Sequence, residues 1–128
     1  MTGFIGNIEK ETLENTNFRK VLYTGQHAQL VVMNLLPGEE IGIEVHQNVD
    51  QFFRIEQGTA KFIINDEENN VEAEWAVIVP AGANHNVINT GETELKLYTV
   101  YSPANHPDGT IHTTKAEAEE YEKAQHQG

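Results

Sequence analysis

Short runs of alternating or uniformly apolar residues recur along most of the chain. Residues 18–23 (FRKVLY), 27–36 (HAQLVVMNLL) and 95–101 (LKLYTVY) are rich in β-branched and aromatic residues, as strands are. Pro and Gly at 37–38 provide a strong turn signal after the second run. The pattern predicts about eight to ten short strands at hairpin spacing, which is typical of a closed barrel or a double-sheet β fold.

The two ends of the chain depart from this pattern. Residues 3–17 have no clean period, and we expect an irregular arm or a short edge strand there. Residues 102–113 are rich in Pro, Gly and Asn and predict a loop. The capping-box sequence at 114–117 (TKAE) then predicts a short surface helix over 115–125. The expected fold class is therefore all-β with a short C-terminal helix.

Two stretches, 38–58 and 79–89, hold residues with metal-binding chemistry. Glu44 and His46 are two positions apart in an alternating run, so a strand directs both side chains to one face. Gln51 opens the next apolar run, and His85 follows a Pro-Gly turn in the second stretch. Two imidazoles, a carboxylate and an amide are the makeup of a divalent transition-metal site.

The spacing of these residues resembles the two-part signature of the cupin superfamily, G-x5-H-x-H-x4-E-x6-G followed by P-x-G-x2-H-x3-N. Glu44 stands where the first His is expected, and Gln51 stands where the Glu is expected. All other signature positions match: Gly38, His46, Gly58, Pro80, Gly82, His85 and Asn89. Several fixed residues recur at fixed spacings in two separate blocks, so the resemblance is specific.

The resemblance spans roughly residues 30–101. It implies a double-stranded β-helix, the jelly-roll cupin barrel, as a single domain over residues 1–128. The core of this domain is expected at about 20–101, and the C-terminal loop and helix at 102–128. The resemblance also extends to the small proteins called mannose-6-phosphate isomerase-like.

The expected metal ligands are Glu44, His46, Gln51 and His85, which together carry one negative charge, as three His and one Glu do. In one version of the site, Gln51 binds the ion through its amide oxygen. In the other, Gln51 is a hydrogen-bond donor behind two His and one carboxylate, the pattern associated with non-haem iron. Asp50 is a rival carboxylate, but only Gln51 preserves the gaps after His46 and before Gly58. The ion itself is left open among Zn, Fe, Mn, Ni, Co and Cu.

Composition narrows the possible partners. Twenty acidic residues against eight Lys and Arg give a formal charge of -12, which disfavours nucleic acid and anionic membrane surfaces. The chain has no Cys, so a disulfide scaffold, a thiolate nucleophile and a thiolate zinc site are excluded. The N-terminal residues show no signal-peptide pattern, and we expect a cytoplasmic protein.

Three functions stay open at this stage. The first is a metal-dependent enzyme, of isomerase or dioxygenase type, acting on a small organic substrate. The second is a module that binds a metal or a small ligand without catalysis, and the third is a metal-free structural barrel. Few basic residues are available for a phosphate, and the nearest in sequence are Arg54 and Lys61.

Some supporting residues can also be proposed. A proton-transfer role is open for Glu56, His27 or Tyr98, and the roles of His106 and His112 in the C-terminal loop stay undetermined. Apolar pocket walls are expected from Phe53, Ile55, Ile63, Val87 and Leu97.

The motif strand also suggests an interface. If Glu44 and His46 face inward, then Ile41, Ile43 and Val45 face outward as an apolar patch. A second copy of the chain is the simplest cover for this patch, so a homodimer is expected.

Overall fold

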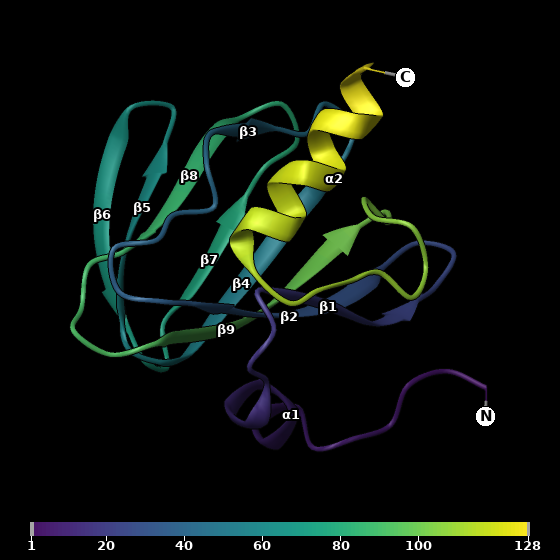
Figure 1. Cartoon of the computed structure of the whole chain (residues 1–128), viewed down its shortest axis with the longest axis horizontal. Helices are drawn as coiled ribbons and strands as arrows, with labels where there is room; N and C mark the ends of the chain where they lie inside the picture. The colour runs from purple at the N-terminus through teal and green to yellow at the C-terminus, as the bar shows by residue number, and fades with distance from the viewer. Residues whose placement is uncertain (1, 128) are drawn as a thin grey trace.

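Two antiparallel sheets make up most of the fold in the computed structural model, which describes residues 2–127 (Figure 1). The six-stranded sheet has the order β10-β1-β2-β9-β4-β7, and the four-stranded sheet has the order β3-β8-β5-β6. The strands are β1 (Arg19–Thr24), β2 (Gln29–Leu35), β3 (Glu44–Val45), β4 (Asp50–Gln57), β5 (Thr59–Ile64), β6 (Glu67–Glu72), β7 (Ala76–Val79), β8 (Asn84–Asn89), β9 (Leu95–Ser102) and β10 (Ile111–His112). The helices are α1 (Ile8–Glu14) and α2 (Lys115–Gln127).

The core lies between the two sheets. Phe53 on β4 and Phe62 on β5 are both fully buried, and their rings meet edge to face with centroids 4.9 Å apart. This contact joins the six-stranded sheet to the four-stranded sheet, because β4 and β5 belong to different sheets. The expected all-β, jelly-roll barrel with a short C-terminal helix is confirmed.

Strand alternation decides which side chains enter the barrel. Along β4, Gln51, Phe53 and Ile55 are buried, while Phe52 and Arg54 are only partly so. A strand directs successive side chains to opposite faces, so the polar Gln51 shares the inner face with two apolar residues. This strand therefore carries an amide into the barrel interior.

The turn between β4 and β5 depends on Gly58. Its φ of +96° lies where L side chains are strained, and a Cβ there would be 2.9 Å from the backbone oxygen of Glu94. Glu74, between β6 and β7, also adopts a positive φ, of 77°. The backbone therefore keeps a glycine-type conformation at Glu74 although the residue has a side chain.

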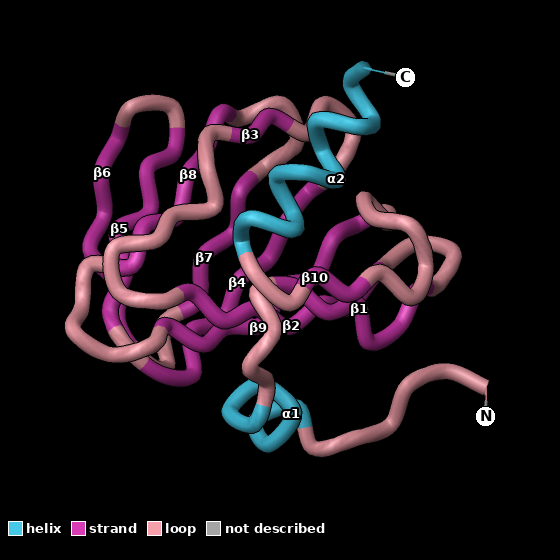
Figure 2. The backbone as a smooth tube through the Cα atoms, viewed as in Figure 1, coloured by secondary structure: helices cyan, strands magenta, loops and turns pink. Residues whose placement is uncertain are grey.

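The N-terminal segment was predicted wrongly. Instead of an irregular arm or edge strand, residues 8–14 form α1, which lies below β2 and β9 in the view of Figure 2, with α2 above them. The Asn7 side chain accepts a hydrogen bond from the backbone N–H of Lys10 and caps the helix, and Thr12 is buried. The helix is too short for its sequence to show a clear apolar period, so tertiary packing stabilises it.

The C-terminal helix begins at its expected cap. Thr114 Oγ1 accepts a hydrogen bond from the backbone N–H of Glu117, and the Glu117 carboxylate accepts one from the N–H of Thr113. Ala118 is buried and Tyr121 is half-buried, so one side of α2 packs on the barrel. Within the described residues, neither helix has the length and hydropathy needed to cross a membrane.

Candidate metal centre

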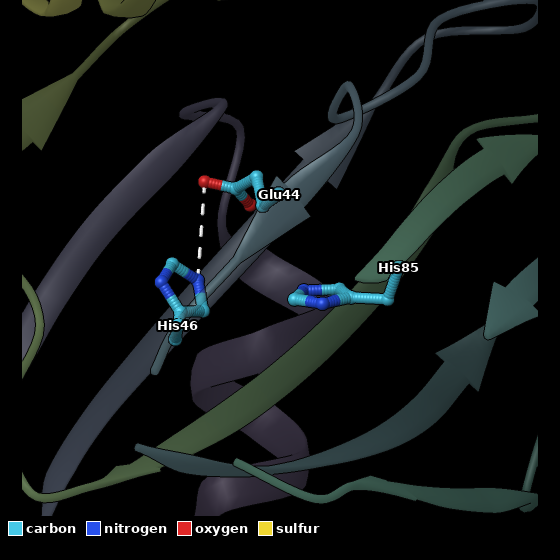
Figure 3. A group of neighbouring side chains, drawn as sticks. All are labelled: Glu44, His46 and His85. Atoms are coloured by element: carbon cyan, nitrogen blue, oxygen red, sulfur yellow. Dashed lines mark ion pairs between the residues drawn. The ribbon is translucent and has the colours of Figure 1, made fainter. Parts of the chain in front are cut away.

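Three potential ligands lie together at one end of the barrel. Glu44 on β3 is directly opposite His85 on β8, and His46 follows β3 on the same side (Figure 3). One donor atom from each of these side chains lies within 4.8 Å of the others. Only Glu44 and Val45 of the stretch 38–58 form the strand β3, and its pairing with β8 is enough to bring the two sequence blocks together.

The two imidazoles present nitrogen atoms that have no other partner. Nε2 of His46 and Nε2 of His85 are buried and without a hydrogen bond among the described residues. Nδ1 of His85 lies 3.5 Å from the backbone oxygen of Ala83, which favours the tautomer with the proton on Nδ1 and a lone pair on Nε2. Nε2 of His46 is 4.0 Å from Oε2 of Glu44, a separation that two ligands about 2.0–2.2 Å from one ion can have.

The amide nitrogen of Gln51 has a hydrogen-bond partner, whereas its amide oxygen has none among the described residues. Its Nε2 donates to Oγ1 of Thr99 at 3.0 Å, and the Thr99 hydroxyl donates to the backbone oxygen of Phe52 at 2.8 Å. The amide oxygen of Gln51 is buried and has no partner among the described residues. Gln51 pairs with Tyr101, whose ring lies 5.9 Å from that of His46. Gln51 is thus paired with a residue whose ring is near His46, and its amide oxygen has no partner within the described part of the chain.

Asp50, the alternative carboxylate ligand, instead binds the backbone of a nearby turn. Its Oδ1 accepts a hydrogen bond from the backbone N–H of Ala81 at 2.8 Å, and the residue is exposed. Asp50 therefore stabilises the turn before β8, because its parity places it on the face opposite to that of Gln51.

Burial sets the charge states of the cluster. It lowers the pKa of His46, and the positive charge of Arg19 lowers it further. Burial also lowers the pKa of His85, although Glu44 opposes this. Burial raises the pKa of Glu44, while Arg19 and His85 act in the other direction. Neutral imidazoles are the form that binds a metal ion, so the two His and the acid fit a divalent ion.

A cavity of about 620 Å³ opens beside the cluster. Both polar and apolar residues line it: Arg19, Ile43, Glu44, Val45, His46, Asn105, His106, Pro107, Tyr121 and Glu122. The expected apolar walls are wrong, because Phe53, Ile55, Val87 and Leu97 are fully buried in the core and Ile63 also lies away from the cavity. Inward-facing apolar residues fill a small barrel, and the open space is left at its end, where the loop and α2 contribute.

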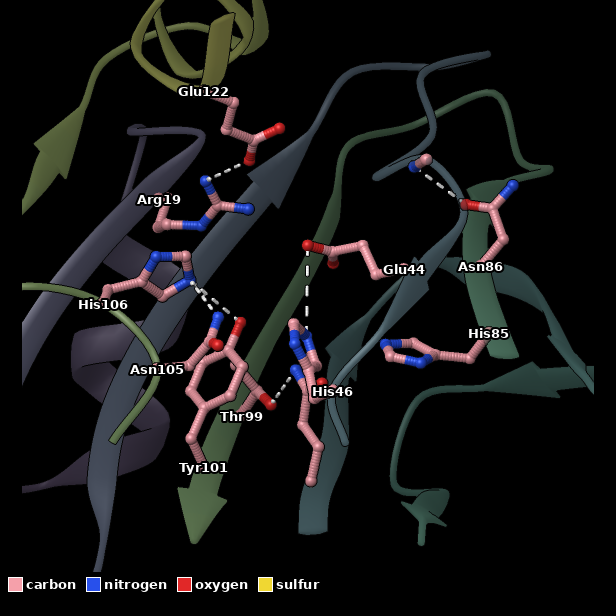
Figure 4. A network of polar contacts seen from close by, with 12 residues as sticks. Arg19, Glu44, His46, His85, Asn86, Thr99, Tyr101, Asn105, His106 and Glu122 are labelled. Carbon is pink, nitrogen blue, oxygen red and sulfur yellow. Dashed lines mark hydrogen bonds and ion pairs between the residues drawn. The ribbon is translucent and has the colours of Figure 1, made fainter. Parts of the chain in front are cut away.

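Arg19 is a wall residue that the sequence analysis missed. It is 1% exposed, and Figure 4 shows its guanidinium beside Glu122 and His106. Its alternation with buried Val21 on β1 was an available signal, since both then face inward. Arg54 and Lys61, the cations named from the sequence, instead pair with Glu56 and Glu68 at 2.9 and 2.8 Å and lie outside the cavity.

The C-terminal loop brings His106 to the cavity. Tyr101 Oη is 3.2 Å from Nε2 of His106, and the Asn105 amide nitrogen is 3.4 Å from the same atom. An amide NH2 group only donates, so Nε2 accepts and the Tyr101 hydroxyl donates. Burial, followed by the charge of Arg19, lowers the pKa of His106 to about 3. Burial raises the pKa of Tyr101. Both groups are therefore neutral at pH 7.

The residues considered for proton transfer from the sequence lie away from the metal cluster. His27 is exposed in the turn before β2, and Glu56 pairs with Arg54. Tyr98 packs against Phe52, with ring centroids 6.2 Å apart, on the other face of β9 from Tyr101. None of these three residues is among the described residues that line the cavity. His112 contacts the Arg19 guanidinium at 3.4 Å and so supports the wall.

Comparisons with known proteins agree with this architecture. The chain is 43% identical to BH2720 of Bacillus halodurans, whose crystal structure superposes with a TM-score of 0.90 over 91% of this chain and 93% of that one. It is 50% identical over 121 residues to YrkC of Bacillus subtilis, covering 90% of this chain and 65% of YrkC, so it spans less than two thirds of that relative.

A more distant match is mannose-1-phosphate guanylyltransferase ManC of Salmonella typhimurium, with 28% identity over 78 residues, which is 61% of this chain and 16% of ManC. The profile of the Cupin domain family matches residues 31–101, which include both motif stretches and every residue of the Glu44, His46 and His85 cluster. The chain therefore belongs to the cupin family.

Proposed function

We propose that this cupin binds a divalent transition-metal ion through Glu44, His46 and His85, with the amide oxygen of Gln51 as a fourth ligand. The observation that carries the proposal is that three of the buried side-chain polar atoms without partners among the described residues belong to these proposed ligands: Nε2 of His46, Nε2 of His85 and Oε1 of Gln51. Buried polar atoms almost always have a partner, and an ion supplies one for all three at once. The NH2 group of Gln51 donates to Thr99, and the amide oxygen is the atom of this side chain that has no partner among the described residues.

We further propose that the protein is a metal-dependent enzyme acting on a small organic molecule in the 620 Å³ cavity. A bound divalent ion supplies Lewis-acid polarisation of a substrate oxygen. The residues of the chain orient the substrate and control protons. Tyr101 donates its hydroxyl proton to Nε2 of His106, and this hydrogen bond holds the His106 ring at the cavity wall. Tyr121 of α2 shields one side from water.

The class of reaction stays open between isomerase and dioxygenase types. The match to ManC is the support for the mannose-6-phosphate isomerase-like subgroup, and it covers a small part of that protein. A phosphorylated sugar carries about two negative charges, whereas the described cavity lining holds one cation, Arg19. The cavity therefore supports a sugar phosphate poorly.

The alternative is a cupin that binds a metal or small ligand without catalysis. Polar lining residues and a half-buried Glu44 suit a binding role as well as a catalytic one. The test is turnover of the metal-loaded protein with a panel of keto acids, diketones and sugars. Product formation supports the enzyme, and a tightly held ion without turnover on any member supports the binding module.

Elemental analysis of purified protein tests the metal site itself. His46→Ala and His85→Ala should each lose the ion, because each removes one of the buried nitrogens. His27→Ala, which removes an exposed His from a turn, is the matched control and should retain the metal content of the parent. Equal metal content in all three variants and the parent would show that the ligand assignment is wrong.

We also propose a homodimer formed along β3. Ile43 and Val45 are 72% and 43% exposed, and β3 is at the edge of its sheet. The third residue of the expected patch, Ile41, was assigned wrongly, because it packs against the core. Light scattering should report twice the monomer mass, and Ile43→Lys should shift it towards the monomer. A parent that stays monomeric at micromolar concentration contradicts this proposal. A single domain over residues 1–128 and a cytoplasmic location stay predictions.

A further inference from the structure

Arg19 is a buried cation whose hydrogen-bonding groups are only partly used. Its side chain is almost completely inaccessible, yet Nε has no hydrogen-bond partner among the described residues. Nη1 lies 3.4 Å from Nδ1 of His112, and its distance of 3.7 Å from the Glu122 carboxylate exceeds that of a hydrogen bond. A guanidinium in this state has lost hydration without a full replacement.

This cation forms part of the wall of the same cavity as the metal cluster. Arg19 and the pair Glu44 and His46 all line the 620 Å³ space. Figure 4 shows the guanidinium on the side of the site away from His85. A ligand in the cavity can therefore contact both Arg19 and the cluster.

We propose that Arg19 binds the carboxylate of a small organic acid, with the rest of that acid directed at the metal centre. This assignment rests on the proposed metal site and names the class of its ligand. The planar fork of a guanidinium matches a carboxylate with two parallel hydrogen bonds, which would satisfy the donors that Glu122 and His112 leave unused.

The charges at the cavity favour a single negative charge on the ligand. Of the described lining residues, Arg19 is positive and Glu44 and Glu122 are negative, a sum of -1. A divalent ion changes this sum to +1, because -1 plus 2 is +1. One carboxylate then makes the site neutral, whereas a phosphate with about two charges would leave an excess of negative charge.

Glu122 on α2 competes with a ligand carboxylate for the Arg19 guanidinium. Its side chain is 49% exposed and its carboxylate lies 3.7 Å from Nη1 of Arg19, so it stays beside the guanidinium and a ligand carboxylate must compete with it. The neighbouring Tyr121 also lines the cavity. The C-terminal helix therefore contributes a side chain that holds Arg19 in place until the ligand arrives.

The experiment measures acid binding to the metal-loaded protein by calorimetry. Acetate, pyruvate and benzoate are compared with acetamide, pyruvamide and benzamide, which have nearly the same shape without the charge, and inorganic phosphate is the competing anion. At least one acid should bind about tenfold or more tightly than its amide and more tightly than phosphate. If no acid is preferred over its amide, or if phosphate binds best, the proposal is overturned.

Two variants locate the effect. Arg19→Lys keeps the charge but not the fork and should weaken acid binding about tenfold. Glu122→Gln removes the competitor and should tighten it about threefold, while Glu120→Gln, at an exposed position on the same helix, should match the parent. Parent-like binding in both Arg19→Lys and Glu122→Gln contradicts the role of Arg19. If Arg19→Lys does not fold, the Glu122→Gln variant and the comparison of acids with amides still test whether Arg19 binds a carboxylate.

Metal content separates this inference from the proposed function. Elemental analysis of Arg19→Lys and Glu122→Gln should give the same ion content as the parent, because neither residue is a ligand. Loss of acid binding with the ion retained supports the assignment to Arg19. A protein that retains its ion in the His46→Ala and His85→Ala variants contradicts the metal site instead.

Discussion

Glu44 and His85 lie directly opposite each other where β3 pairs with β8. This pairing joins a carboxylate from the first motif stretch to an imidazole from the second, and both side chains then face the same cavity end of the barrel. Residues opposite each other in an antiparallel pair have Cβ atoms about 4.5–5.5 Å apart, a distance suited to sharing one ion. Two strands that are far apart in sequence thus form the centre.

Glu44→Gln should weaken metal binding by at least about tenfold, because it removes the negative charge from the ligand set while keeping its size. Competition with a chelator measures the change in metal affinity. The matched control is Asp50→Asn, since Asp50 is the neighbouring carboxylate and its Oδ1 binds the backbone of Ala81. Equal losses in both variants would show that only the general negative charge matters.

Thr99→Val should lower the free energy of unfolding by about 1–3 kcal/mol, because Gln51 Nε2 and the Phe52 carbonyl both lose a buried partner. It should also reduce metal affinity, since the Gln51 amide is then free to turn its oxygen away. Urea unfolding and chelator competition measure the two effects. Thr99→Ser retains the hydroxyl and should keep the metal affinity of the parent; a loss as large as that of Thr99→Val contradicts the positioning role.

Gly58→Ala should destabilise the protein by about 1–3 kcal/mol more than Gly38→Ala. Both residues have positive φ, but a Cβ at Gly58 would lie 2.9 Å from the Glu94 oxygen, whereas nothing lies within 4 Å of one at Gly38. The difference in the free energy of unfolding between the two variants therefore isolates the close approach. Equal values would mean that the β4–β5 turn adjusts without cost.

His106 should make stability depend on pH. Burial lowers its pKa to about 3, whereas the unfolded chain takes up the proton near pH 6.5. Between these values the unfolded state binds more protons, so stability contributed by neutral His106 is present above about pH 6.5 and decreases as the pH falls. The contribution approaches about 1.4 kcal/mol per pH unit.

His106→Gln should remove that contribution. Urea unfolding of the variant and the parent between about pH 7 and about pH 5 should show the parent losing more stability on acidification. His27→Gln, at an exposed turn, should keep the pH dependence of the parent. A parent and a His106→Gln variant with parallel pH profiles would contradict the buried, neutral state of His106.

Local sequence was sufficient for much of the barrel and part of the site. Alternation placed Glu44 and His46 on one face, and the paired motif stretches predicted that His85 would join them, which the β3–β8 pairing does. The capping box at Thr114 marked the start of α2. These features depend on near neighbours in the chain, so a period of two or a fixed cap spacing reveals them.

Only the tertiary structure decided what surrounds the cluster. Arg19 on β1 and His106 in the C-terminal loop reach the same cavity from positions far apart in the sequence, and the apolar residues expected there fill the core instead. The orientation of the Gln51 amide depends on Thr99, a residue of another strand. The reason is physical: alternation in a strand tells which face a side chain occupies, but the residues that meet across that face depend on strand order and on how the ends of the barrel are covered.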